Sequence, residues 1–132
     1  MSSANETQVG GEHYRAKGLQ HWDLMAQYNI PYLEGNGSKY IYRWESKGGL
    51  QDLQKCEHYL VKIIEMVEHE GYYHCPWIPP AVLHQFFEDN NVRDMEASIF
   101  TALCTWRTNE ELEVALHNVR HLMEMVQRQT SK

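Results

Sequence analysis

The sequence lacks the segments that would direct a chain into a membrane or out of the cell. No apolar run approaches the roughly 18 residues that a membrane span needs. The opening residues 1–14, MSSANETQVGGEHY, are polar and contain no apolar core of the kind found in signal peptides. We therefore expect a cytoplasmic protein with no membrane partner.

Cysteine is scarce, and its placement argues against both a disulfide framework and a metal site. The three cysteines, Cys56, Cys75 and Cys104, cannot all pair within one chain, and none lies in a CxxC motif. This favours small buried thiols in a reducing compartment. The densest histidine group, His69 and His74 beside Cys75, lacks the paired close spacing of a structural zinc site. We expect no metal ion held by the protein alone.

A surplus of basic residues is also absent, since the net charge is −6. Residues 67–132 carry five basic and ten acidic side chains, whereas residues 34–66 carry five of each. A protein that binds duplex nucleic acid normally has a basic surface, so nucleic acid is an unlikely main partner. A small anionic ligand needs only a few cations, and the balanced middle third can supply them.

The stretch EGNGSKYIYRW, residues 34–44, has the composition of a phosphate-binding loop but lacks its spacing. A Walker motif places four residues between its first glycine and the Gly-Lys-Ser/Thr, so that successive backbone N–H groups surround the phosphates. Here Ser38 precedes Lys39, and the glycines are too close together. The stretch is not a Walker motif.

Apolar residues recur at helical spacing through most of the chain. The clearest case is residues 50–70, where Leu53, Cys56 and Leu60 continue a seam at intervals of three and four residues, and Gly71 ends the helix. Gly48-Gly49 is expected to end the helix before it. The predicted helices cover residues 19–30, about 33–46, 50–70, about 80–88, about 92–105 and about 108–128, the last opened by a Thr108–Glu111 capping box. We predict one all-α domain over residues 1–132, an antiparallel helical bundle behind a flexible lead at 1–18.

A weak internal echo appears at an offset of 62 residues. The aligned pairs are Trp44 with Trp106, Ile41 with Leu103, Leu50 with Leu112, Leu60 with Leu122 and Ile63 with Met125. Each copy consists of a helix, a short turn and a longer helix, and two such hairpins would dock as an antiparallel four-helix core. Any two amphipathic hairpins can align this well, so the echo leaves duplication open.

One strip of the predicted helix at 33–46 concentrates polar donors. At 100° per residue, Asn36, Lys39, Tyr40, Arg43 and Lys47 lie within about 60° of one line. Arginine and lysine bind phosphate, and a nucleobase stacks on an aromatic ring. The alternative is an ordinary solvated face with long basic side chains. The strip alone leaves both interpretations open.

Two features near the strip bear on this choice. Gly35 and Gly37 weaken the start of a helix without an evident packing reason, and they would let a ligand approach the backbone near a helix N-terminus. In the next helix, Asp52 and Tyr59 flank the apolar seam and can reach a neighbouring helix. In contrast, Lys55 is expected on the opposite, solvated face, with His58 and Lys62.

A resemblance to a known family adds weight to the ligand interpretation. The motifs, in order, are VGGEHY at 9–14, HWD at 21–23, LEGNGSKYIYRW at 33–44, KGGLQDLQK at 47–55 and HYL at 58–60. Over residues 9–66 the chain resembles the phage-encoded small-protein family catalogued as a domain of unknown function, DUF3310. The departures are His21, where the family has proline, and Cys56, where it has alanine. The family includes a deoxynucleoside monophosphate kinase of a T7-like bacteriophage that has no Walker motif.

The resemblance implies a nucleotide site. The residues that it would contribute to nucleotide binding are Gly10, Gly11, His13, Tyr14, Glu34, Gly35, Asn36, Lys39, Tyr40, Arg43, Lys47, Lys55 and His58. Lys39, Arg43 and Asp52 would be the catalytic residues of a kinase. In that reaction Lys39 and Arg43 would hold phosphates, and Asp52 or Glu34 would hold Mg²⁺ that enters with the nucleotide.

Two other functions fit the same sequence. The protein would act as a nucleotide sponge if it bound a host immune second messenger without turnover. It would act as an inhibitor of a host protein if its acidic C-terminal half bound that partner. We also expect a homo-oligomer, because Tyr72, Tyr73, Trp77 and Ile78 lie in a proline-rich loop that a small core would leave uncovered.

Overall fold

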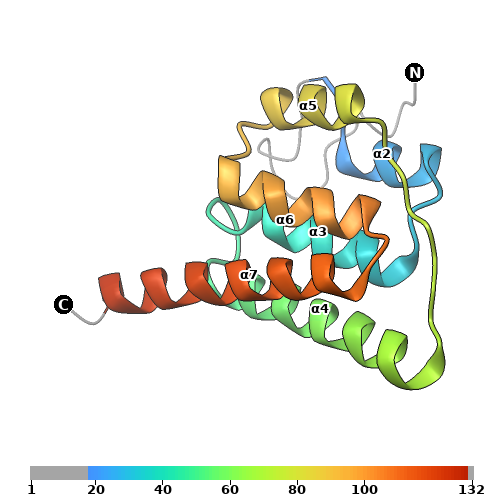
Figure 1. Cartoon of the computed structure of the whole chain (residues 1–132). Coiled ribbons are helices and arrows are strands. Elements are labelled where there is room, and N and C mark those ends of the chain that lie inside the picture. The colour runs from blue at the N-terminus through green and yellow to red at the C-terminus, as the bar shows by residue number, and fades with distance from the viewer. Residues whose placement is uncertain (1–17, 131–132) are drawn as a thin grey trace.

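The protein is all-α, as predicted. A computed structural model describes residues 18–130, and these contain helices but no strand. The helices are α2 (His21–Gln27), α3 (Tyr32–Arg43), α4 (Leu50–Glu70), α5 (Pro80–Asp89), α6 (Asp94–Thr105) and α7 (Asn109–Thr130). Figure 1 shows α3, α4, α6 and α7 packed together, with α2 and α5 at one side. The candidate residues Gly10, Gly11, His13 and Tyr14 lie outside the described residues.

The four central helices form the antiparallel core that the echo suggested. Trp44, just after α3, contacts the first turn of α6, which requires α3 and α6 to run in opposite directions. Contacts of Glu57 with Arg120 and of Glu68 with Asn109 show that α4 and α7 are antiparallel as well. Their buried faces supply most of the apolar core, including Ile41, Leu53, Leu60, Ile63, Leu103, Leu112 and Val119.

Some helices end before the predicted residue because backbone hydrogen bonds close the last helical turn earlier in the chain. Helix α2 ends at Gln27 because Asn29 adopts a φ of 50°, and the Ile30 N–H bonds to the Met25 carbonyl. This is a Schellman closure with asparagine in the left-handed position. Helix α3 ends at Arg43 rather than Ser46. Gly49, with φ 58° and ψ −135°, precedes α4 rather than ending the helix before it.

Other ends agree with the sequence. Helix α4 covers the predicted residues, and Gly71 follows it with a φ of 67°. The Thr108 hydroxyl accepts a 3.3 Å hydrogen bond from the Glu111 N–H, as the capping box requires. The Glu111 carboxylate accepts from the Arg107 N–H and the Thr108 hydroxyl rather than from the Thr108 N–H. Helix α6 starts at Asp94 rather than near Val92.

The echo corresponds to a repeated backbone. Helices α3 and α6 match residue for residue at the offset of 62, since Tyr32–Arg43 becomes Asp94–Thr105. The left-handed Asn29 has its counterpart in Asn91, with a φ of 53°. The Schellman bond from Ile30 to Met25 recurs from Val92 to Phe87. We therefore call α2–α4 the first repeat and α5–α7 the second repeat.

Each repeat also completes a buried hydrogen bond of the other. The Trp44 indole donates to the Glu96 carboxylate at 2.8 Å, and the Trp106 indole donates to the Glu34 carboxylate at 2.9 Å. Glu34 and Glu96 are themselves counterparts at the offset of 62, as are the two tryptophans. The two bonds lie at opposite ends of the α3–α6 pair and relate the repeats by an approximate two-fold axis.

Candidate anion-binding site

Three cations surround one tyrosine ring between α3 and α4. The Lys39 Nζ lies 4.7 Å from the centre of the Tyr40 ring, and the Arg43 Cζ lies 5.0 Å from it. From α4, the Lys55 Nζ reaches to 5.1 Å of the same ring. These separations lie within cation–π range. We call Lys39, Tyr40, Arg43, Lys55 and the adjacent Tyr59 the Tyr40 cluster.

The cluster continues into an open aromatic surface. The Tyr59 ring lies nearly parallel to the Tyr40 ring, with centres 6.1 Å apart and an angle of 18°. Tyr32, 74% exposed, meets Tyr59 edge-on at 6.5 Å. Desolvation raises the pKa of the Tyr59 phenol, and its hydrogen bond with Tyr32 adds to the shift, so this hydroxyl stays protonated at neutral pH.

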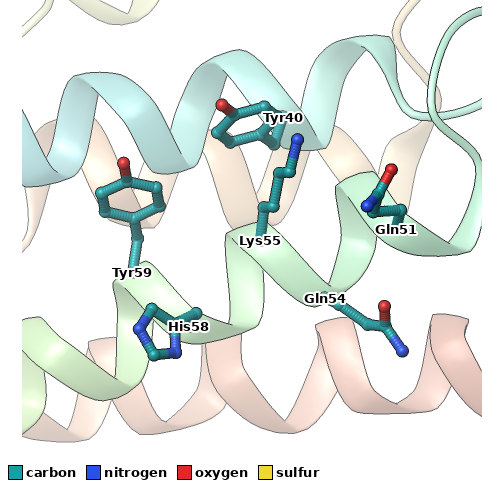
Figure 2. A pocket seen from close by; sticks show the side chains of 6 residues that line it. All are labelled: Tyr40, Gln51, Gln54, Lys55, His58 and Tyr59. Atoms are coloured by element: carbon teal, nitrogen blue, oxygen red, sulfur yellow. The ribbon is translucent and has the colours of Figure 1, made fainter.

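A pocket of about 430 Å³ opens on this surface, lined by Tyr40, Gln51, Gln54, Lys55, His58 and Tyr59. Figure 2 shows Lys55 and Tyr59 pointing from α4 toward Tyr40, whereas Gln54 and His58 point away from α3. The volume lies within the range of small-molecule sites. The pocket therefore joins the Lys55 ammonium group, two phenol rings and two amide side chains in one place.

Asp52 holds the turn between α3 and α4 and supports Arg43. Its carboxylate, 1% exposed, accepts a 3.0 Å hydrogen bond from the Gly48 N–H and lies 3.4 Å from the Arg43 Nε. The second separation is long for a hydrogen bond, and within residues 18–130 the Arg43 Nε has no acceptor. The ion pair orients the guanidinium beside Tyr40.

Apart from the Arg43–Asp52 pair, the positive charge of the cluster is not offset by ion pairs with the acidic side chains that the structure describes. Glu45 pairs with Arg93 at 3.3 Å, and Glu57 pairs with Arg120 at 2.8 Å. Of the acidic side chains that the structure describes, none forms an ion pair with Lys39 or Lys55. Like charges so close together repel, and a bound anion would relieve that repulsion.

His21, the residue that departs from the family pattern, lies behind the cluster. Its Nε2 is 2.7 Å from the Ser38 Oγ, and its ring stacks on Tyr42 at 5.2 Å. Burial lowers the pKa of His21 to about 4, with Lys39 and Arg43 contributing through their charges. The imidazole is therefore neutral at pH 7 and adds no charge to the site.

Glu34 is not part of the cluster. It is fully buried, and its carboxylate accepts hydrogen bonds from the Tyr72 hydroxyl at 3.0 Å and from the Trp106 indole at 2.9 Å. This carboxylate raises the pKa of Tyr72, together with the larger effect of burial. Glu34 thus joins the two repeats, and the structure does not bring it to the strip.

Gly37 has a packing role that the sequence analysis did not find. A Cβ added to Gly37 would lie 3.1 Å from a methyl group of Leu103 and 3.6 Å from the Tyr59 Cβ. Gly37 therefore lets α3 approach α4 and α6 closely. Gly35 faces Met25, whose sulfur would lie 3.5 Å from an added Cβ. Helix packing therefore explains the glycine at position 37, whereas an added side chain at Gly35 would make only ordinary contact.

The remaining candidates divide between the cluster and its surroundings. The Asn36 amide donates to the Tyr32 carbonyl one turn earlier, and Lys47 lies beyond the end of α3 in the turn to α4. His58 lines the pocket at its far edge. Lys55 is exposed, as predicted, and its long side chain also reaches the Tyr40 ring on α3. Helical spacing predicts the face of the helix on which a residue lies, but not how far a long side chain extends from that face.

Three residues in or beside the pocket were missed. Tyr32 lies at the first position of α3, one residue before the predicted start of this helix. Gln51 and Gln54 carry no charge or aromatic ring to single them out. Their positions on the α4 face near Lys55 were available from the helical wheel.

Fold and site together define an all-α protein with a positively charged, tyrosine-lined surface on its first helical hairpin. The model of a protein family of unknown function, DUF3310, matches residues 9–61. The match supports the resemblance read from the motifs, and it lies largely within the first repeat. No curated protein and no solved structure matches the chain.

Two kinds of feature are absent from the part of the chain that the structure describes. Within residues 18–130 no group of three or more histidine, cysteine, aspartate or glutamate side chains is placed to hold a metal ion. None of the described helices is long and apolar enough to cross a membrane.

Proposed function

We propose that the Tyr40 cluster binds a phosphorylated nucleotide. The observation that carries the proposal is the set of three cations within about 5 Å of one phenol ring, of which only Arg43 has an acidic partner. Phosphate would bind between Lys39, Arg43 and Lys55 through charge-assisted hydrogen bonds. The base would lie toward Tyr59, which lines the pocket, and the adjacent exposed ring of Tyr32.

The proposal favours binding over catalysis that depends on a protein-held metal. Kinase chemistry was expected to use Asp52 or Glu34 for Mg²⁺, but both carboxylates are buried and already accept hydrogen bonds within the protein. Neither fits the role of a metal ligand. In the kinase form of the proposal, Mg²⁺ enters with the nucleotide, and Lys39, Arg43 and Lys55 orient the phosphates and offset their charge.

Titration calorimetry with a nucleotide panel tests the binding proposal. The panel contains deoxynucleoside monophosphates, nucleoside triphosphates, cyclic dinucleotides and inorganic phosphate. We expect saturable binding that Lys55→Ala weakens by about tenfold, in line with the loss of one charge-assisted bond. Lys62→Ala is the matched control, because it removes the same charge from α4 two turns further along. Equal affinity of the Lys55→Ala and wild-type proteins would count against the proposal.

Turnover is tested separately by chromatography of the nucleotides after incubation with the protein. Formation of nucleoside diphosphates from a triphosphate and a monophosphate identifies a kinase. Recovery of the unchanged nucleotide from the protein identifies a sponge. If no member of the panel binds, the nucleotide proposal is wrong, and a protein inhibitor becomes the alternative to pursue.

A further inference from the structure

The two repeats share their helix order and the backbone through α3 and α6, but not the residues of the Tyr40 cluster. At the offset of 62, Lys39, Tyr40, Arg43, Asp52 and Lys55 correspond to Thr101, Ala102, Thr105, Val114 and His117. The second repeat therefore has neither lysine, nor the arginine, nor the central tyrosine ring. In place of the buried Asp52, it has a Val114 that is 59% exposed.

The close contact behind the cluster is also absent from the second repeat. Gly37, which allows α3 to approach Tyr59 on α4, corresponds to Ile99, and Tyr59 corresponds to His121. Ile99 brings a full side chain to the position where the first repeat has none, and it is completely buried. The narrow α3–α4 contact that supports Tyr40 and Tyr59 thus has no equivalent between α6 and α7.

The described cations of the second repeat are engaged by protein groups. Arg93 pairs with Glu45, Arg120 with Glu57 and Arg128 with Glu124. Arg107 donates to the carbonyls of Pro76 and Trp106 at 2.8 and 2.9 Å. Lys39 and Lys55 of the first repeat have no such partner among the residues that the structure describes. The free positive charge of the core therefore lies in one repeat.

From this asymmetry we infer that the chain is a fused pair of equivalent helical units in which only the first unit binds the anionic ligand. The second unit keeps the shared backbone and supplies Trp106 and Glu96 to the hydrogen bonds between the units, but its copy of the site has been lost. One chain then binds one ligand. This inference rests on the proposed function, because it specifies how many such sites a chain carries and where.

Equilibrium dialysis of the full chain against labelled ATP and, separately, inorganic pyrophosphate measures the number of sites. We expect one molecule of either probe per chain. The loss variant Lys39→Thr/Tyr40→Ala/Lys55→His places the residues of the second repeat in the first and leaves the Arg43–Asp52 pair in place. We expect it to bind at least tenfold more weakly, with a melting temperature near that of the wild type.

The matched control is Thr101→Ala/His117→Ala, which alters the corresponding face of the second repeat and should keep one site at unchanged affinity. Any one of three results would overturn the inference. These are two sites per wild-type chain, binding of one probe at full affinity by the loss variant, and lost binding in the control. If neither probe binds, the panel nucleotide that does bind replaces them in the dialysis; wild-type protein that binds no member of the panel would contradict the proposed function itself, and the inference would fall with it. Loss of folding in the triple variant leaves the stoichiometry and the control to decide.

Discussion

Arg43 and Asp52 form an ion pair that closes the turn between α3 and α4, with the Arg43 Nε 3.4 Å from the Asp52 Oδ2. The same guanidinium lies 5.0 Å from the Tyr40 ring, so one residue serves both the fold and the candidate site. The carboxylate is almost completely buried, and arginine is its only cationic partner in the described part of the chain. Substitutions at Arg43 therefore have two effects that must be measured separately.

We expect Arg43→Ala to weaken nucleotide binding by roughly 1.5–3 kcal/mol, tenfold or more, through loss of a charge-assisted phosphate bond. It should also destabilise the fold by about 1–3 kcal/mol, because Asp52 is left buried with a single hydrogen bond. Arg43→Lys should restore only part of the affinity, since lysine cannot form two parallel bonds to phosphate. Calorimetry measures the binding affinity, and urea unfolding measures the free energy of unfolding.

A second substitution separates the two effects of Arg43. In Arg43→Ala/Asp52→Asn the buried charge is gone, while the new amide oxygen can still accept from the Gly48 N–H. Stability should therefore recover relative to Arg43→Ala, whereas affinity should not. A solvated, unused Arg43 would instead tolerate Arg43→Ala within about 0.5 kcal/mol and leave ligand binding unchanged.

The bonds between the repeats should contribute measurably to stability. Trp106→Phe removes the indole donor from the buried Glu34, and Trp44→Phe removes it from Glu96, so each should lower the free energy of unfolding by about 1–3 kcal/mol. The two sites lie at opposite ends of the α3–α6 pair. We expect the losses to add within about 0.5 kcal/mol in the double variant, measured by urea unfolding. If both single variants kept the free energy of unfolding of the wild type, these bonds would not stabilise the interface between the repeats.

The buried His21 predicts a pH dependence of stability. Its pKa falls from 6.5 in the unfolded chain to about 4 in the folded protein, so the unfolded chain binds more protons between these values. Stability should therefore decrease as the pH falls from 6.5 toward 4, by up to about 3 kcal/mol. His21→Gln, which cannot be protonated, should flatten this part of the profile. Parallel profiles for the two proteins would show that His21 does not titrate as described.

The two glycines of α3 should respond in opposite directions to added side chains. Gly35→Ala places a methyl group at ordinary contact distance from Met25 and should stabilise the helix by about 0.5–1 kcal/mol. Gly37→Val forces new atoms against Leu103 and should destabilise the fold by roughly 1–3 kcal/mol. Thermal unfolding compares the two variants, and a Gly37→Val protein as stable as the wild type would disprove the packing role.

Oligomerisation remains a prediction. The core covers Ile78 completely and engages the Tyr72 hydroxyl, but Tyr73 and Trp77 stay 57% and 48% exposed. We expect at least a dimer at micromolar concentration, and we expect Tyr73→Ser/Trp77→Ser to shift it toward monomer. Sedimentation velocity measures the oligomeric state of the wild-type protein and of the variant. A monomeric mass for the wild-type chain would contradict the prediction.

Helical spacing predicted the fold class, the core seam of α4 and its end at Gly71. It also brought Lys39, Tyr40 and Arg43 onto one face, because these residues belong to a single helix whose period is fixed. Asp52 and Tyr59 were predicted to reach a neighbouring helix, and both contact α3. The family match over residues 9–61 supports the resemblance.

The features that could not be predicted from the sequence depend on contacts between helices. The roles of Glu34 and Glu96 required the three-dimensional pairing with tryptophans more than fifty residues away. The packing role of Gly37 required knowing that Leu103 lies against it. The echo at 62 residues was too weak to prove a repeat until helix bounds and the left-handed Asn29 and Asn91 coincided.

The crossed tryptophan–glutamate bonds also bear on how the chain unfolds. Glu34 obtains its indole donor from the second repeat, and Glu96 obtains its own from the first. Separating the repeats would remove the indole donor from both carboxylates, leaving Glu34 only the Tyr72 hydroxyl, and would expose the apolar faces between the repeats to water. Separation of the repeats therefore raises the free energy of both repeats at once. A chain assembled from two similar parts should therefore lose its structure in one cooperative, two-state transition rather than in two steps.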